Sequence, residues 1–310
     1  MADPWRGISM RAVFQLMALA PLIVCSATFA QAADDADAPI KFRSNLRYSE
    51  AGPSCMLDLA IPRMPAGRRP AVVVIHGGGW IEGDKSSFAS ALHGVPGNIE
   101  EFARLGFVAA TINYRLSREA PFPAALDDCR AAVRYLRAHA EEFRIDPEHV
   151  GAYGNSAGGH LALLLSMNEE PSADDTQDPA QRFSSGVQAS ASDSGPLDLT
   201  RQHQQNQLRG VIETFLGGPP QGKLVDAYRR ASPAAHPSVK APLLLIYGAD
   251  DEQVDVRTAD EFVAALVKAG HQDVSYIRLA KVGHCPHSLV RVPWLKPVVN
   301  DFFLRTLEQK

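Results

Sequence analysis

The stretch from residue 150 to residue 165 constrains the fold more than any other. A short apolar run ends in Gly154-Asn155-Ser156-Ala157-Gly158, and a second apolar run, 161–165, reads as a helix. A strand, a tight turn and a helix in this order indicate a turn that holds its central residue in a strained backbone conformation. The flanking glycines let strand and helix approach each other closely. Ser156 is therefore a candidate nucleophile above the sheet edge; a glycine–serine turn without function is the alternative.

Strands and helices alternate through the rest of the chain. Continuous apolar runs predict strands that are buried on both faces of a sheet, at 71–75, 107–112, 149–153, 187–191, 242–247 and 274–279. Alternating patterns at 42–49 and 56–61 predict an antiparallel hairpin at a sheet edge. With amphipathic helices between the strands, these features predict an α/β fold: a mostly parallel sheet of eight strands with helices on both faces.

The length of 310 residues fits one large domain, which we expect over residues 33–310. Residues 171–235 interrupt the alternation with one helix-like segment, 207–216, and are expected to form a small insertion that caps a pocket. The formal net charge of −4 offers no basic surface for a nucleic acid.

The first residues have the layout of a secretory signal. Two arginines precede a largely apolar run over residues 12–30, and Ala30-Gln31-Ala32 supplies small residues at the positions that a signal peptidase reads. We expect a signal peptide over residues 1–32, with translation starting at Met1 or Met10. The protein would then be secreted or periplasmic, without stable membrane association. A retained membrane anchor is the alternative, although the run is short and a proline interrupts it.

The cysteines leave a disulfide undecided. Cys25 would leave with the signal peptide, so that Cys55, Cys129 and Cys285 remain. Three thiols can form at most one disulfide, and the sequence does not say which. The cysteines and histidines show no spacing typical of a metal site, and no cofactor is implied.

A glycine-rich turn follows the predicted strand 71–75, in the sequence His76-Gly77-Gly78-Gly79-Trp80. Glycine costs backbone entropy, so three in a row need a reason. Gly78 and Gly79 could present backbone N–H groups to an oxyanion with no side chain in the way. An ordinary glycine turn is the alternative.

A serine nucleophile needs a base to accept its proton, and the base needs a partner that orients it. Ser156, Asp251 and His284 each lie just past the end of a predicted strand. In an open α/β sheet, sites form at these carboxyl ends. Ser156 and His284, with an aspartate between them in the chain, either Asp250 or Asp251, are therefore candidates for a catalytic triad in the order Ser, Asp, His.

In these motifs the chain resembles the α/β-hydrolases of the esterase and lipase type, the group that includes hormone-sensitive-lipase-like esterases and BD-FAE-type carbohydrate esterases. The resemblance covers roughly residues 45–307. The motifs that carry it are His76-Gly77-Gly78-Gly79-Trp80 with Gly83-Asp84-Lys85, Asn113-Tyr114-Arg115-Leu116, Gly154-Asn155-Ser156-Ala157-Gly158-Gly159-His160, Tyr247-Gly248-Ala249-Asp250-Asp251 and Gly283-His284.

The resemblance implies roles for the triad candidates. Ser156 matches the nucleophile and His284 the general base, with His287 as a rival base. Asp251 matches the triad acid in a G-x-x-D-x-x-V pattern, and Asp250 is its rival.

The resemblance also implies an oxyanion hole and marks two departures, at Asp255 and at Cys285-Pro286-His287-Ser288, where the family often has glycine and aromatic residues. Gly78, Gly79 and Ala157 match the backbone donors of that hole. Trp80 either lines the substrate pocket or packs beneath its loop. Asp255 stands where the family often has proline.

The function implied is that of a secreted serine carboxylic-ester hydrolase. It would form an acyl-enzyme on short-chain or carbohydrate-linked esters, such as acetylated or feruloylated polysaccharide, with no cofactor. A serine peptidase of the prolyl-oligopeptidase type is one alternative, but 310 residues leave no room for the usual propeller domain. A non-catalytic binding protein on a hydrolase scaffold is another, and it would be expected to have a broken triad.

Overall fold

The computed structural model describes residues 39–63, 67–88, 98–167, 179–205, 207–286, 292 and 294–308. The expected signal peptide and the rival base His287 lie outside these ranges. None of the helices formed by the described residues has the length and apolar character needed to cross a bilayer.

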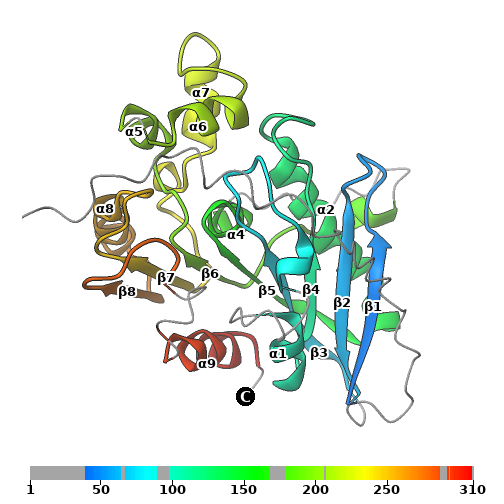
Figure 1. Ribbon diagram of the computed structural model, residues 1–310. Helices are drawn as coiled ribbons and strands as arrows, with labels where there is room; N and C mark the ends of the chain where they lie inside the picture. The colour runs from blue at the N-terminus through cyan, green and yellow to red at the C-terminus, as the bar shows by residue number, and fades with distance from the viewer. Residues whose placement is uncertain are drawn as a thin grey trace, which may run out of the picture. The chain divides into compact units, whose positions relative to one another are not determined.

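Eight strands form one sheet in the order β1-β2-β4-β3-β5-β6-β7-β8 (Figure 1). The first two strands pair antiparallel, β2 pairs antiparallel with β4, and the remaining neighbours are parallel. This confirms the predicted fold class. The strands are β1 (Ile40–Arg47), β2 (Met56–Pro62), β3 (Arg69–Ile75), β4 (Val108–Ile112), β5 (Ile145–Asn155), β6 (Ala189–Asp193), β7 (Leu243–Gly248) and β8 (Val274–Leu279).

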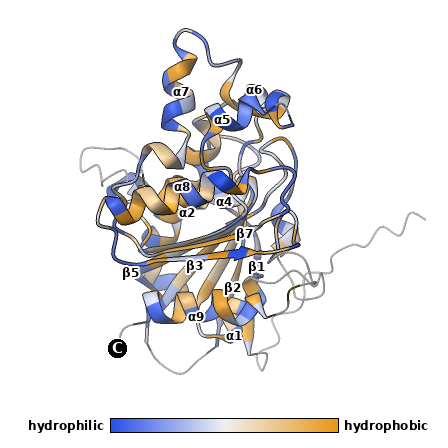
Figure 2. Ribbon diagram, turned by 90° about the vertical axis from the view of Figure 1, so that its left-hand side faces the viewer, coloured by the Kyte–Doolittle hydropathy of each residue, from blue (hydrophilic) through white to orange (hydrophobic). Residues whose placement is uncertain are grey.

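Helices cover both faces of this sheet (Figure 2). One face is covered by α1 (Ile99–Arg104) and α9 (Leu295–Leu307), and the other by α2 (Ala124–Ala138), α4 (Ala157–Met167) and α8 (Val256–Lys268). The short helices are α3 (Ala140–Phe143), α5 (Leu199–Gln204), α6 (Arg209–Leu216), α7 (Leu224–Arg230) and the 3₁₀ turns η1 (Lys85–Phe88), η3 (Pro179–Arg182) and η4 (Pro233–Ala235).

The sequence of strand β3 is apolar without alternation because side chains on both of its faces are buried. Val72 and Val74 belong to the core beneath α1 and α9, whereas Val73 and Ile75 belong to the core beneath α2 and α4. All four side chains are fully buried. Because both faces are covered, the strand from Ala71 to Ile75 has no position for a polar side chain.

The segment between β6 and β7 differs from its prediction. The sequence pattern predicted one helix over 207–216, whereas the structure has three, α5, α6 and α7. The additional helices, α5 and α7, are only six and seven residues long, which is too short for an apolar periodicity to show in the sequence. These three helices lie beyond the carboxyl ends of β6 and β7 (Figure 1), and we refer to residues 198–232 as the insertion.

Candidate active site

Ser156 occupies the turn between β5 and α4. Its φ of 51° is in the left-handed region, in agreement with the strained turn expected from the sequence. A Cβ on Gly158 would lie 2.0 Å from the carbonyl oxygen of Ile75, and one on Gly154 would lie 2.4 Å from the backbone of Gly158. Any side chain at either position would push the helix off the sheet, which explains the two glycines.

Two hydrogen bonds join the three triad candidates. His284 Nε2 lies 2.9 Å from Ser156 Oγ, and His284 Nδ1 lies 2.7 Å from Asp251 Oδ2. The carboxylate at Nδ1 favours the tautomer with hydrogen on Nδ1, so that Nε2 can accept the serine proton. The Asp251 side chain is fully buried, whereas the His284 side chain is 15% exposed toward the site. Asp250, the alternative acid, is not the carboxylate that contacts His284.

The turn after β7 fixes the orientation of Asp251. Its Oδ1 accepts the backbone N–H groups of Gln253 and Val254, both at 2.9 Å. This leaves Oδ2 for the histidine. Val254 is itself fully buried, between β7 and α8. The turn is therefore anchored in the core.

A cavity of about 330 Å³ lies directly over Ser156. The two predicted oxyanion donors on the glycine-rich turn line it, and both have positive φ, 105° for Gly78 and 59° for Gly79. Among the described residues, the N–H groups of Gly78, Gly79 and Ala157 donate to no other protein oxygen. Ala157 is the first residue of α4, where helical N–H groups have no partner within the helix. The lining residues are Gly78, Gly79, Ile81, Glu82, Asn155, Ser156, Leu208, Val211, Gln253, His284 and Cys285.

The Gly83-Asp84-Lys85 motif, which follows the glycine-rich turn, attaches that turn to neighbouring parts of the sheet. Lys85 Nζ forms a buried ion pair with Asp58 of β2 at 2.8 Å. Asp84 accepts a hydrogen bond from the Asn113 side chain, just past β4. The loop that follows the glycines is thus tied to two strands of the sheet.

Trp80 packs in the core beneath the loop and does not line the cavity. It is 1% exposed and stacks on Phe215 of α6, with ring centroids 4.4 Å apart. Its ring also meets that of His160 edge-on, at 5.0 Å. Of the two roles expected for Trp80, the structure thus supports packing and not substrate contact.

The three described cysteines are buried free thiols, and no disulfide joins them. Burial raises the pKa of Cys55 to about 11 and holds the pKa values of Cys129 and Cys285 well above their usual range. Cys285 lines the cavity next to His284, but a thiol that resists ionisation is a weak nucleophile.

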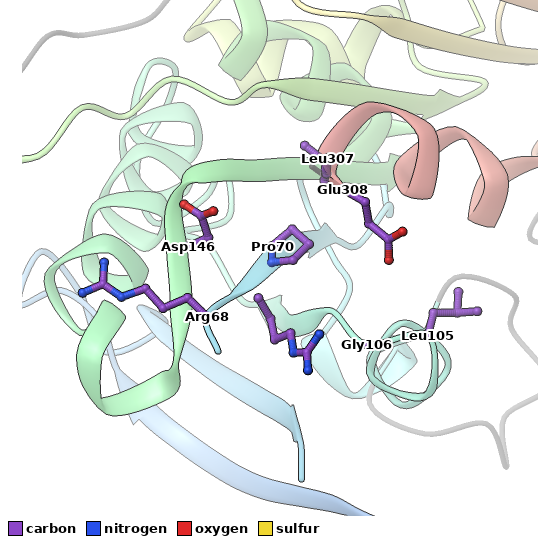
Figure 3. A pocket seen from close by; sticks show the side chains of 8 residues that line it. Arg68, Pro70, Leu105, Gly106, Asp146, Leu307 and Glu308 are labelled. Carbon is purple, nitrogen blue, oxygen red and sulfur yellow. The ribbon is translucent and has the colours of Figure 1, made fainter. Parts of the chain in front are cut away.

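A separate cavity of about 440 Å³ lies at the opposite end of β3 (Figure 3). Arg68, Asp146 and Glu308 are among its lining residues. No serine, cysteine or histidine is among the described residues that line it.

Comparison with known proteins agrees with this geometry. The family model BD-FAE matches residues 57–266, more than half of the chain. The probable carboxylic ester hydrolase LipM of Mycobacterium tuberculosis is 30% identical over 247 residues, which cover 77% of this chain and 55% of that protein. The chain spans about half the length of the curated relatives it matches.

Two solved structures are similar over most of the chain. The bifunctional GH43-CE of Bacteroides eggerthii aligns with a TM-score of 0.72 at 26% identity, covering 86% of this chain and 38% of that one. The propionate-bound thermophilic esterase Est2 of Thermogutta terrifontis aligns with a TM-score of 0.67 at 26% identity, covering 88% and 97%. The chain therefore belongs to the BD-FAE family and has the α/β-hydrolase fold.

Proposed function

We propose that the protein is a serine hydrolase of carboxylic esters. The observation that carries the proposal is the hydrogen-bonded series Ser156–His284–Asp251 at the turn before α4, with distances of 2.9 and 2.7 Å. Neutral imidazole between a hydroxyl and a buried carboxylate is the arrangement that activates a serine. The resemblance to esterases in sequence and structure supports the same reaction.

In the proposed reaction Ser156 Oγ attacks the ester carbonyl carbon while His284 Nε2 takes the hydroxyl proton. The N–H groups of Gly78, Gly79 and Ala157 stabilise the resulting oxyanion, each by about 3 kcal/mol. The intermediate collapses, and the alcohol leaves with the proton from His284. Water then gives a proton to His284 and attacks the acyl-enzyme, which releases the acid and regenerates the serine.

Short acyl groups are the proposed substrates. The cavity over Ser156 measures about 330 Å³, at the small end for a ligand site. Its apolar side is formed by Ile81, Leu208 and Val211, whereas Glu82 and Gln253 contribute polar groups. A small apolar pocket suits an acetyl, propionyl or butyryl chain, and polar groups could bind the hydroxyls of a carbohydrate alcohol.

Export is part of the proposal. It is supported by the two arginines, the apolar run and the small residues that end at Ala32. Sequencing the mature N-terminus after expression in a bacterial host with an intact secretion system tests it. A mature chain beginning at Ala33 is expected, and an uncleaved chain in the cytoplasm would contradict it.

The enzymatic proposal is tested with p-nitrophenyl acetate, butyrate and octanoate. We expect turnover of acetate and butyrate and at least about tenfold slower turnover of octanoate, because the apolar side of the cavity, formed by Ile81, Leu208 and Val211, offers a long acyl chain little surface to contact. Ser156→Ala should lower kcat by about 10⁴-fold or more. The matched control is Ser166→Ala, which removes a hydroxyl bonded to the Leu163 carbonyl within α4 and should retain activity. Full activity in Ser156→Ala would refute the proposal.

A further inference from the structure

A side chain of the insertion reaches the turn that carries Asp251. Gln202 of α5 is 2% exposed. Its Nε2 donates to the backbone carbonyl of Gln253 at 2.6 Å, and its Oε1 accepts the backbone N–H of Asp255 at 3.3 Å. Both ends of the amide are therefore used on one short segment of backbone.

The same segment orients the proposed catalytic acid. The N–H groups of Gln253 and Val254 donate to Asp251 Oδ1, and the next N–H, that of Asp255, donates to Gln202. Peptide groups of the turn thus have Asp251 on one side and Gln202 on the other. A shift of this backbone away from Gln202 would rotate the carboxylate that faces His284.

Asp255 adds a second connection between the insertion and the turn. Its carboxylate accepts hydrogen bonds from Gln205 at 2.7 Å and from Arg201 at 3.2 Å. Hydrogen bonds from Arg257 are the main reason that the pKa of Asp255 lies below its usual range. The proline that the family often carries here would have neither this carboxylate nor an N–H for Gln202.

We propose that Gln202 is a positioning residue for the triad, which holds the turn so that Asp251 Oδ2 faces His284. The inference rests on the proposed function. Gln202 does not line the cavity over Ser156, and its contact with Gln253, which does, is with the backbone carbonyl, so that it acts through the turn that holds Asp251. Its loss should therefore lower the rate of the chemical step and leave substrate binding unchanged.

The test compares Gln202→Leu with the wild-type enzyme in two measurements. The first is kcat and KM with p-nitrophenyl acetate. The second is labelling by paraoxon, which phosphorylates an activated serine once and releases one p-nitrophenol. The amount of p-nitrophenol released gives the number of reactive sites, and the time course gives the rate constant of labelling. We expect kcat and the labelling rate constant to fall about 10- to 100-fold, because small displacements of catalytic groups have effects of this size. KM should stay within about twofold and the number of labelled sites should be unchanged.

Two further variants separate positioning from loss of structure. Tyr228→Phe removes a hydrogen bond to the Gly218 carbonyl inside the insertion, 3.1 Å long, and should keep the wild-type labelling rate. Gln202→Glu keeps an acceptor for the Asp255 N–H but cannot donate to Gln253 as an anion, and its labelling rate constant should also fall.

Labelling of Gln202→Leu at the wild-type rate constant would overturn the inference, whether or not fewer sites react. An equal loss in Tyr228→Phe would also overturn it, since the effect would then belong to the insertion as a whole. If paraoxon does not label the wild-type protein at all, the proposed function fails, and this inference fails with it.

Discussion

The candidate site has two halves that are built in different ways. The nucleophile half, formed by the turns after β3 and β5, is fixed by backbone sterics: at Gly78, Gly154 and Gly158 a Cβ would lie 2.0 to 2.4 Å from another main-chain atom. The acid–base half, formed by the loops after β7 and β8, has one such contact, at Gly248, where a Cβ would lie 2.1 Å from the Gly283 carbonyl oxygen, and its catalytic side chains are otherwise held by hydrogen bonds. Asp251 is held by two N–H groups, and its turn by Gln202, 51 residues away from Gln253 along the chain.

The two halves of the site should therefore respond differently to amino-acid substitution. A steric contact between backbones leaves no room for even one methyl group, so substitution there acts on the fold. A hydrogen bond that is lost costs about 1 kcal/mol, or about 1–3 kcal/mol if its partner stays buried and unpaired. Substitutions in the acid–base half should therefore lower the rate by graded amounts while the fold persists.

The largest effect is expected from Gly158→Ala. The added methyl group would lie 2.0 Å from the Ile75 carbonyl oxygen, so β3 and α4 would have to separate. We expect destabilisation of more than about 3 kcal/mol and loss of activity, measured by urea unfolding and p-nitrophenyl acetate turnover. Gly210→Ala is the matched control, because a Cβ there meets nothing within 4 Å. A Gly158→Ala protein of wild-type stability would show that the steric account is wrong.

Asp251→Asn should affect catalysis and leave the fold intact. The amide oxygen can still accept the N–H groups of Gln253 and Val254, so the free energy of unfolding should change by less than about 1 kcal/mol. The amide cannot stabilise a protonated imidazole, and kcat should fall by about 10³- to 10⁴-fold. Asp250→Asn, measured beside it, should stay near wild type; a larger loss there would make Asp250 the acid.

The contact between the nucleophile helix and the insertion should depend on pH. His160 of α4 is fully buried, donates from Nε2 to the Ala231 carbonyl at 2.7 Å, and burial lowers its pKa to about 4. Between pH 6.5 and 4 the unfolded chain binds the proton more readily than the folded one, so stability falls as the pH falls through this range. The loss should approach about 3 kcal/mol at the acid end.

This pH effect is measured by urea unfolding at pH 7, 6, 5 and 4 in the wild type and in His160→Gln. The decline should be shallower in the variant, because glutamine does not titrate. His236→Gln, at a position that is only partly buried, serves as the control and should keep the wild-type slope. Equal slopes in all three proteins would mean that His160 is not the group responsible.

The smallest effect is expected from Ser194→Ala. The Ser194 hydroxyl accepts the N–H of Cys285 at 3.0 Å and so helps to hold the loop that carries His284. Its loss should lower kcat by about three- to tenfold, in line with one hydrogen bond of about 1 kcal/mol. Ser190→Ala removes an equally buried hydroxyl from β6, the strand that ends just before Ser194; this hydroxyl is bonded to the Ala162 carbonyl, and its loss should leave kcat unchanged. A larger loss in Ser190→Ala would place the effect in the strand and not in the loop.

The same contrast explains what the sequence could predict. The nucleophile turn and the buried strand β3 are local patterns of glycine and apolar residues, so both could be predicted from neighbouring residues alone. The eight strands followed from such patterns as well. The resemblance supplied Asp251 over Asp250, and only in three dimensions does the former face His284.

Other features depend on contacts between distant segments. Helices α5 and α7 are short, and they are stabilised by the packing of a few buried residues, Leu199 and Gln202 in α5 and Ala227 and Tyr228 in α7, which leaves no periodic pattern. Nothing in the sequence indicates that the side-chain amide of Gln202 forms a hydrogen bond with the Gln253 carbonyl. The position of Trp80 depends on Phe215, which lies far away along the chain. The only visible signal was Asp255, a departure from the family pattern at the point where the insertion contacts the turn.

The place of the insertion matters for protein engineering. It joins β6 to β7 without altering the register of either strand with its neighbours, so a different segment could be grafted between them to reshape the pocket. In such a chimera, joining the ends of the new segment to β6 and β7 would not be enough, because the segment must also hold the turn that carries Asp251. A donor segment without a glutamine equivalent to Gln202 would change the pocket and slow the chemistry together, and a screen for new substrates would score both changes as a failure to bind.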